Sequence, residues 1–201
     1  MKLVVVALTL WGSSYALAVP DSSAGAVSHD SAPPGIRLRY FERIDDGVYK
    51  GSKPRSDADY RYLQSLQIKY IVDLRVLPWL DQFEKRKARQ YGMELIPVHI
   101  NASPVSPSVK HIETALALLR TMPCHPVYFH CALGRDRTAL VAALYQMYFR
   151  GLSPEAADRY LHEAGYKDGW VRSGLERYLE KHPNPSPSLL SFEPNQRQCA
   201  P

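Results

Sequence analysis

The sequence lacks any apolar run long enough to cross a bilayer, which excludes a membrane-spanning helical protein. At the N-terminus, Lys2 is followed by a short apolar stretch, Leu3–Trp11, and then by a segment that ends in Ala16-Leu17-Ala18. This order predicts a signal peptide over residues 1–18, cut before Val19. We therefore expect a periplasmic or secreted protein with no stable membrane insertion after cleavage.

Cysteine is scarce, which excludes a disulfide-rich scaffold. The three cysteines are Cys124, Cys131 and Cys199, an odd number, so at least one thiol is expected to be free. Cys124 and Cys131 would lie roughly 23 Å apart along an extended segment, too far for a disulfide. Cys199 can pair with Cys124, or both can remain single thiols.

No Lys/Arg run of the nucleic-acid-binding type appears either, which argues against a nucleic-acid partner. The formal net charge is +5 and falls by one when Lys2 is removed with the signal peptide. A modest positive charge suits an anionic substrate, but it does not identify one.

The composition along the chain predicts one domain between two tails. Residues 19–35 are rich in Ser, Ala, Pro and Gly and are expected to be a disordered N-terminal tail. Residues 183–201 contain five prolines and are expected to be a C-terminal tail. The remaining residues, 36–182, are long enough for a single packed core.

Short β-branched segments alternate with helical patterns in this domain, which predicts an α/β fold with a central, mostly parallel sheet flanked by helices. The expected strands cover residues 48–50, 70–74, 94–100 and 127–130. Six helices are expected. The first begins at Ser56, the second has an apolar face bearing Leu80, Phe83 and Tyr91 and ends at Gly92, and the third begins at Ser106-Pro107. The fourth covers 138–149 before Gly151, the fifth follows Ser153-Pro154, and the sixth covers 170–181.

The segment Val127–Thr138 carries the chemical signal: a strand, a Gly-containing loop, and the start of an apolar helix. Such a loop before a helix N-terminus points several N–H groups at one anion the size of a phosphate. The same donors would stabilise a Cys131 thiolate as the nucleophile. Arg137 can grip two phosphate oxygens, and Thr138 can donate its hydroxyl to the sulfur. The N–H groups of Ala132, Leu133 and Gly134 would complete the phosphate site.

The stretch His130–Thr138, HCALGRDRT, resembles the HC-x5-R-[ST] signature of the protein-tyrosine phosphatase superfamily. A looser resemblance extends over residues 40–180, and the compact length is similar to the dual-specificity branch. The resemblance implies a dual-specificity-phosphatase-like fold, a phosphocysteine intermediate on Cys131, and no metal or other cofactor. It also implies a phosphorylated protein or an inositol phosphate as substrate.

The expected general acid is missing from its usual place. The family takes an Asp from a loop that corresponds to residues 97–107, and that stretch contains no Asp or Glu. Asp136 is the candidate instead, because myotubularins and bacterial phosphatases with a GKDR-type loop carry an acid at this position. Asp136 can also be a carboxylate that only stiffens the loop, and His99 and Asn101 are further candidates.

Further basic residues surround this segment. Arg135 would add positive charge at the mouth of the site, which in the family accompanies activity on inositol phosphates. Lys53 and Arg75 are candidate substrate-binding residues, although Arg75 can equally be a structural partner of Asp73. His130 is expected to organise the loop from behind.

Zinc binding is a weaker interpretation of Cys124-His125 and His130-Cys131, because zinc-ligand pairs usually have two to four intervening residues. The favoured function is a cysteine-dependent phosphomonoesterase. The alternatives are a non-catalytic phosphate-binding pseudophosphatase and an arsenate reductase, which would need further redox cysteines near the site.

Overall fold

The computed structural model describes residues 32–191, except residues 77, 104, 122–124, 168 and 170–172. The predicted signal peptide, Cys124, Cys199 and Trp170 lie outside the described residues, so the pairing of the two cysteines stays a prediction. Among the helices described, none combines the length and the apolar character needed to cross a bilayer.

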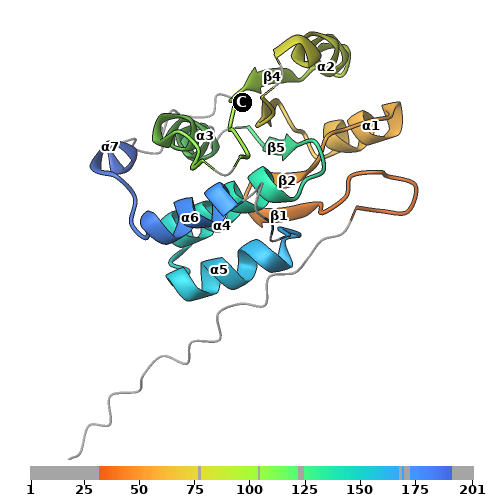
Figure 1. The fold of residues 1–201 in the computed structure, drawn as a ribbon. Coiled ribbons are helices and arrows are strands. Elements are labelled where there is room, and N and C mark those ends of the chain that lie inside the picture. The colour runs from red at the N-terminus through yellow and green to blue at the C-terminus, as the bar shows by residue number, and fades with distance from the viewer. Residues whose placement is uncertain are drawn as a thin grey trace, which may run out of the picture.

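A five-stranded sheet forms the centre of the molecule (Figure 1). Its strands are β1 (Glu42–Asp45), β2 (Val48–Ser52), β3 (Tyr70–Asp73), β4 (Glu94–Pro97) and β5 (Val127–Cys131). They lie in the order β1-β2-β5-β3-β4, and every neighbouring pair is parallel except β1 with β2. The predicted α/β fold with a mostly parallel central sheet is therefore confirmed.

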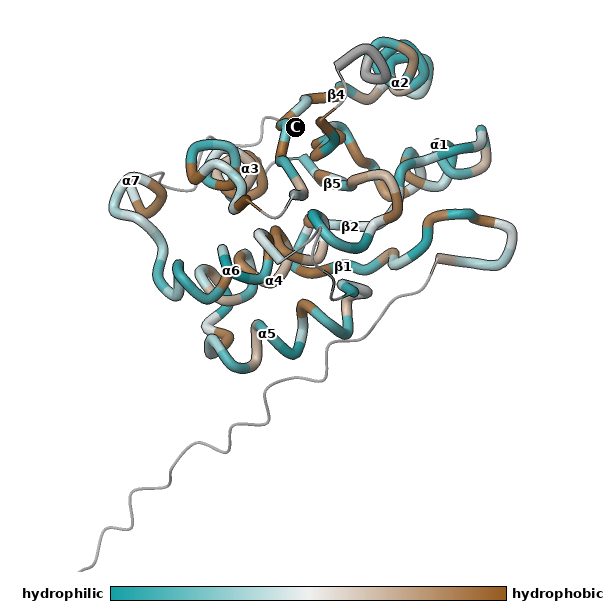
Figure 2. The backbone as a smooth tube through the Cα atoms, viewed as in Figure 1, coloured by the Kyte–Doolittle hydropathy of each residue, from teal (hydrophilic) through white to brown (hydrophobic). Residues whose placement is uncertain are grey.

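In the described part of the chain, seven helices surround the sheet. They are α1 (Asp57–Ser65), α2 (Pro78–Gln90), α3 (Val109–Thr121), α4 (Asp136–Arg150), α5 (Pro154–Glu163), α6 (Ser173–Lys181) and α7 (Pro187–Leu190). Figure 1 shows α1 and α2 on one side of the sheet and the helices from α3 to α6 on the other. In Figure 2 the turns of α5 alternate between hydrophilic and hydrophobic residues, as expected of a helix with one buried face.

Two hydrophobic cores result, because side chains alternate between the two faces of each strand. Val127, Phe129 and Cys131 of β5 belong to the larger core with α3, α4, α5 and α6. Tyr128 belongs to the smaller core with α1 and α2. Burial on both faces explains why β5 is a continuous apolar run in the sequence.

The local signals for helix ends act as their chemistry predicts. Ser56 caps α1 in a capping box with Asp59, and Ser153 caps α5 in front of Pro154. Gly151 ends α4 in the left-handed conformation, with φ of 75°. The prediction of a buried central helix before Gly151 is confirmed, because α4 is buried along most of its length.

Several expected boundaries and faces are wrong. The strand expected over 94–100 ends at Pro97, and the helix expected at Ser106 begins at Val109. Phe83, expected on the buried face of its helix, is 67% exposed. The short helix α7 lies inside the expected C-terminal tail and buries Leu189 in the larger core, so packing continues beyond residue 182.

The first strand, β1, was not predicted, because only one of its two buried residues, Ile44, is apolar and the other is the charged Glu42. That carboxylate is buried and lies 2.9 Å from the Lys50 ammonium of β2. The Tyr160 hydroxyl of α5 donates to it at 2.9 Å. Burial lowers the pKa of Lys50 despite the raising effect of Glu42. The buried Glu42–Lys50 pair and the Tyr160 hydroxyl thus connect β1, β2 and α5 at a place where hydrophobic side chains are usual.

Candidate active site

The loop that follows β5 lies at the carboxyl edge of the sheet, where crevices of parallel α/β sheets usually bind ligands. In the register, Ser52 of β2 pairs with Cys131, and Asp73 of β3 pairs with His130. The ends of three neighbouring strands therefore meet at this loop. Residues 132–135 turn the chain, and α4 begins at Asp136 with its free N–H groups facing the same point.

Gly134 allows the loop to fit tightly against β2. Its φ is 77°, in the left-handed region that disfavours side chains. A Cβ atom at this position would lie 2.5 Å from the Ser52 nitrogen and 2.6 Å from the Gly51 carbonyl carbon. Both backbone conformation and space therefore require glycine here.

Cys131 is a free thiol and only 2% exposed. Burial alone would raise its pKa, and the Thr138 hydroxyl and the Arg137 guanidinium lower it. The backbone N–H groups of Thr138 and Leu133 act in the same direction, and the net pKa of Cys131 lies below its usual value. The Thr138 hydroxyl has no other partner among the described residues, so it is available to the sulfur. The site thus favours a thiolate.

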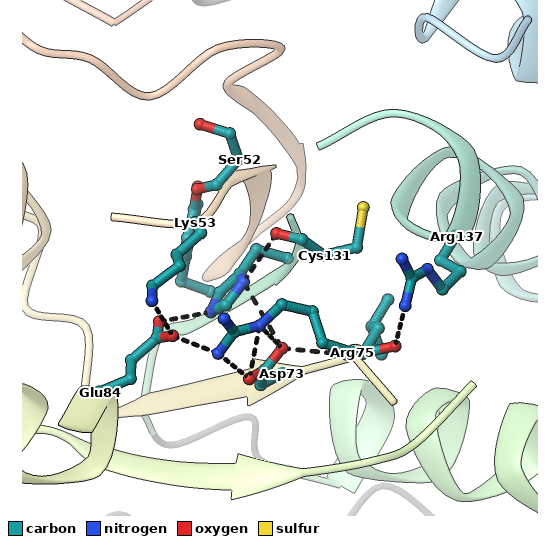
Figure 3. Close-up of polar contacts among 10 residues, drawn as sticks. Ser52, Lys53, Asp73, Arg75, Glu84, Cys131 and Arg137 are labelled. Atoms are coloured by element: carbon teal, nitrogen blue, oxygen red, sulfur yellow. Dashed lines mark hydrogen bonds and ion pairs between the residues drawn. The ribbon is translucent and has the colours of Figure 1, made fainter. Parts of the chain in front are cut away.

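Arg137 has unused hydrogen-bonding capacity. Its Nη1 donates to the Leu74 carbonyl at 3.4 Å, a long contact, and its Nε is buried with no partner in the described part of the chain. Figure 3 shows the Cys131 sulfur pointing away from the carboxylates of Asp73 and Glu84. A half-buried guanidinium with free donors beside a thiolate is suited to bind the oxygens of an anion.

Behind the loop, His130 is fully buried between two carboxylates. Its Nδ1 lies 3.0 Å from the Cys131 carbonyl and 3.8 Å from Asp73 Oδ1. Its Nε2 lies 2.9 Å from Glu84 Oε1, within ion-pair distance. Burial would lower the pKa of His130, but Glu84 and Asp73 raise it above its usual value. His130 thus lies behind the loop, and its organising role stays a prediction.

Glu84 is the residue of this cluster that the sequence did not reveal. It comes from α2, is 2% exposed, and its Oε2 lies 2.5 Å from Arg75 Nη2 and 3.5 Å from Lys53 Nζ (Figure 3). Burial raises the pKa of Glu84, but the cations around it outweigh that effect and lower it. The available signal was its spacing of four residues from Leu80 and Ala88, on the apolar side of the helix.

The contacts of Arg75 fit its structural interpretation and not the substrate-binding one. Its guanidinium binds both oxygens of Asp73 and also reaches Glu84, and the residue is 5% exposed. Lys53, by contrast, is 30% exposed at the side-chain level and borders a cavity together with Ala132 of the loop. Of these two residues, Lys53 is therefore the one whose side chain is open to a ligand.

The acid candidates lie in different surroundings. Asp136 is in the first turn of α4, and its Oδ2 lies 3.8 Å from Arg135 Nη2. Their side chains are only 16% and 19% exposed, so Arg135 is less solvated than a residue at the mouth would be. Asn101 is exposed and donates to the Ser103 hydroxyl. His99 is partly buried in the segment after β4.

Asp73, Glu84 and His130 offer ligand atoms within 4.8 Å of one another, a spacing that a metal ion could use. The guanidinium of Arg75 already stands against both carboxylates, however. A divalent cation would have to share this space with a fixed positive charge. The donor set therefore fits an internal ion-pair network better than a metal site.

The profile of the tyrosine phosphatase family matches residues 35–148. An inositol diphosphatase of Oryza sativa subsp. japonica is 27% identical over 143 residues, which cover 70% of this chain and 68% of the relative. The dual specificity protein phosphatase TpbA of Pseudomonas aeruginosa (strain UCBPP-PA14) is 28% identical over 155 residues, 75% of this chain and 63% of the relative. The chain thus spans about two thirds of the length of these relatives.

Among solved structures, the core catalytic domain of the PP-IP phosphatase SIW14 from S. cerevisiae has the same fold. It superposes with a TM-score of 0.60 at 18% identity and covers 71% of this chain and 85% of that one. The likeness supports the predicted dual-specificity-phosphatase-like architecture.

Proposed function

The chain belongs to the tyrosine phosphatase family, and we propose that it hydrolyses phosphate esters through a phosphocysteine intermediate on Cys131. The observation that carries this proposal is the buried thiol whose pKa is lowered by Thr138, Arg137 and the loop N–H groups. A stable thiolate beside unused Arg137 donors is the arrangement that a nucleophile needs to meet a phosphate.

In the first step, the Cys131 thiolate attacks phosphorus and the bond from phosphorus to the leaving oxygen breaks. The loop N–H groups and Arg137 hold the three equatorial oxygens as negative charge spreads over them. In the second step, water attacks the phosphocysteine, the P–S bond breaks, and inorganic phosphate leaves. The Thr138 hydroxyl stabilises the sulfur as it departs as a thiolate.

Asp136 is the proposed proton donor to the leaving oxygen in the first step, and it would accept a proton from water in the second. Support comes from its place in the loop, five residues after Cys131, and from the lack of any Asp or Glu over residues 97–107. A general acid contributes roughly 10²- to 10⁴-fold to such a step.

Inositol polyphosphates are the proposed substrates, including those that carry a diphosphate group. One relative is named an inositol diphosphatase, and the site has basic residues beyond those that a single phosphate needs. When a diphosphate is cleaved, the leaving group is itself a phosphate, which depends less on protonation than an alkoxide does. A phosphotyrosine protein is the second candidate, supported by the likeness to a dual specificity protein phosphatase.

The test follows phosphate release from inositol hexakisphosphate, an inositol diphosphate, a phosphotyrosine peptide and para-nitrophenyl phosphate, under reducing conditions. Cys131→Ser is expected to abolish release from all four. Asp136→Asn is expected to slow the alkyl esters far more than para-nitrophenyl phosphate, whose leaving group needs little protonation. Retained activity in Cys131→Ser would refute the mechanism.

The pseudophosphatase alternative is not favoured, because Cys131 and Arg137 are both present and the relatives are named as phosphatases. It predicts tight phosphate binding with no release from any ester.

Export remains part of the proposal and is supported by the sequence alone. The pattern Lys2, Leu3–Trp11 and Ala16-Leu17-Ala18 predicts a mature chain that begins at Val19. N-terminal sequencing of the protein recovered from outside the cytoplasm would test this, since an intact Met1 would contradict it.

A further inference from the structure

A cavity of about 550 Å³ opens beside the loop that carries Cys131. Ala132 of the loop forms one part of its wall, Lys53 and Arg55 after β2 form another, and Lys87 of α2 a third. We call this cavity the Lys53 pocket. Ser52, the neighbour of Lys53, pairs with Cys131, and adjacent strands lie about 4.8 Å apart. One small substituted ring could therefore reach both the loop and the pocket.

The charge of Lys53 is not balanced by the buried network next to it. Glu84, which forms the back of the pocket, faces Arg75 and His130 as well as Lys53. Asp73 and Glu84 supply two negative charges, and Arg75 with protonated His130 supplies two positive ones. Lys53 is then an additional positive charge at the pocket.

Arg55 adds a second uncompensated charge. It is exposed, and in the described part of the chain no carboxylate lies within ion-pair distance of its guanidinium. Its backbone N–H donates to Asp59 at 2.8 Å, which fixes the chain where the side chain leaves it. The guanidinium is therefore anchored at its base and open at its tip, as a phosphate-binding arginine should be.

Two residues of α2 complete the cationic rim. Lys87 lies 2.5 Å from Asp57, a carboxylate that is 54% exposed, so water screens this pair and Lys87 remains partly exposed. Phe83 lines the pocket with an exposed ring, and the Arg86 guanidinium lies 5.0 Å from its centroid. The ring thus holds a further cation near the rim.

We propose that the Lys53 pocket binds a second phosphate group of the substrate whose first phosphate lies in the Cys131 loop. This inference rests on the proposed function and narrows it to small polyphosphorylated molecules, because a singly phosphorylated tyrosine leaves the pocket without an anion. Arg55 and Lys87 are then specificity-determining residues, and Lys53 bridges the pocket and the buried network.

The experiment compares Arg55→Gln and Lys87→Gln, singly and together, with the matched control Arg89→Gln, an exposed arginine of α2 that does not line this pocket. Lys53 is left unchanged, because its substitution would also disturb Glu84. The readout is kcat/KM for inositol hexakisphosphate divided by kcat/KM for para-nitrophenyl phosphate, which carries one phosphate. A charge-assisted contact supports about a tenfold fall in this ratio for Arg55→Gln and more for the double variant.

The control Arg89→Gln is expected to keep the wild-type ratio. An unchanged ratio in the double variant would overturn the proposal. An equal loss of kcat/KM on a singly phosphorylated tyrosine peptide would also overturn it. Failure of the proposed function is a separate result, since it appears as no turnover of any ester by the wild-type chain. In that case, calorimetry with inositol hexakisphosphate tests whether the pocket binds phosphate. Arg55→Gln is expected to weaken binding about tenfold, and an affinity equal to that of the wild type would refute the proposal.

Discussion

Replacing Glu84 by Gln is expected to destabilise the protein more than any other conservative change at the site. The carboxylate is 2% exposed and faces three cations, with Arg75 at 2.5 Å, His130 at 2.9 Å and Lys53 at 3.5 Å. Glutamine keeps the shape but removes the charge, and its amide nitrogen must then face His130 or Arg75, which are donors themselves. One buried positive charge is left unbalanced.

Breaking a buried ion pair by removal of one partner costs about 3–5 kcal/mol. For a chain of this size, each 1 kcal/mol lowers Tm by roughly 2–4 °C, so a fall of about 6–20 °C is expected. Urea and thermal unfolding followed by circular dichroism at pH 7 measure both quantities. The matched control is Glu94→Gln, an exposed acid at the start of β4, which should change stability by no more than about 0.5 kcal/mol. If Glu84→Gln lowers the free energy of unfolding by less than about 1 kcal/mol, the buried ion pairs of Glu84 do not contribute the stability argued for them.

Three further outcomes are expected. Gly134→Ala should lower the free energy of unfolding in urea by about 2–4 kcal/mol, because the backbone is left-handed there and a Cβ atom would clash with Ser52 and Gly51. The control Gly92→Ala, at a left-handed position with φ of 73° and open space, should lower it by about 1–2 kcal/mol. The rate of Cys131 alkylation by iodoacetamide should rise with pH to a midpoint below the usual thiol pKa of about 8.5, and Thr138→Ala should move that midpoint upward; an unmoved midpoint contradicts the hydroxyl's role. The stability that His130 contributes should be fully present below about pH 6.5 and fall as pH rises through its raised pKa, while that of Asp73 and Glu84 should fall as pH drops below about 4 through their lowered pKa values. Unfolding free energies of the wild type and His130→Asn across pH 3–10 would test this, and a difference that grows above pH 8 would contradict it.

The sequence predicted the part of the site that is continuous in the chain. Cys131, Arg137 and Thr138 lie on one strand-loop-helix unit whose geometry follows from local rules, so their placement needed no knowledge of tertiary contacts. The fold class followed from alternating strand and helix patterns. The order of the strands was not predictable, because it depends on which non-local pairs form.

Charged residues in the interior were the main source of error. The charge of Glu42 hides β1 from a hydrophobic pattern, and the exposed Phe83, expected on the buried face of its helix, stands next to the buried Glu84. In both places a buried carboxylate is stabilised by a cation of another element, Lys50 of the next strand for Glu42 and the distant His130 for Glu84. A pattern of hydrophobic and polar residues cannot indicate such partners.

The contact of Gly134 with the backbone of Gly51 and Ser52 has a consequence for the energetics of catalysis. Since there is no room for even a Cβ atom between Gly134 and β2, the loop packs closely against that strand and its N–H groups are held in place by the fold. The entropy of arranging these donors is lost during folding and not at each turnover, so the loop is preorganised. Activity and global folding should then be lost together as denaturant is added, with no intermediate range in which a folded sheet carries an inactive loop.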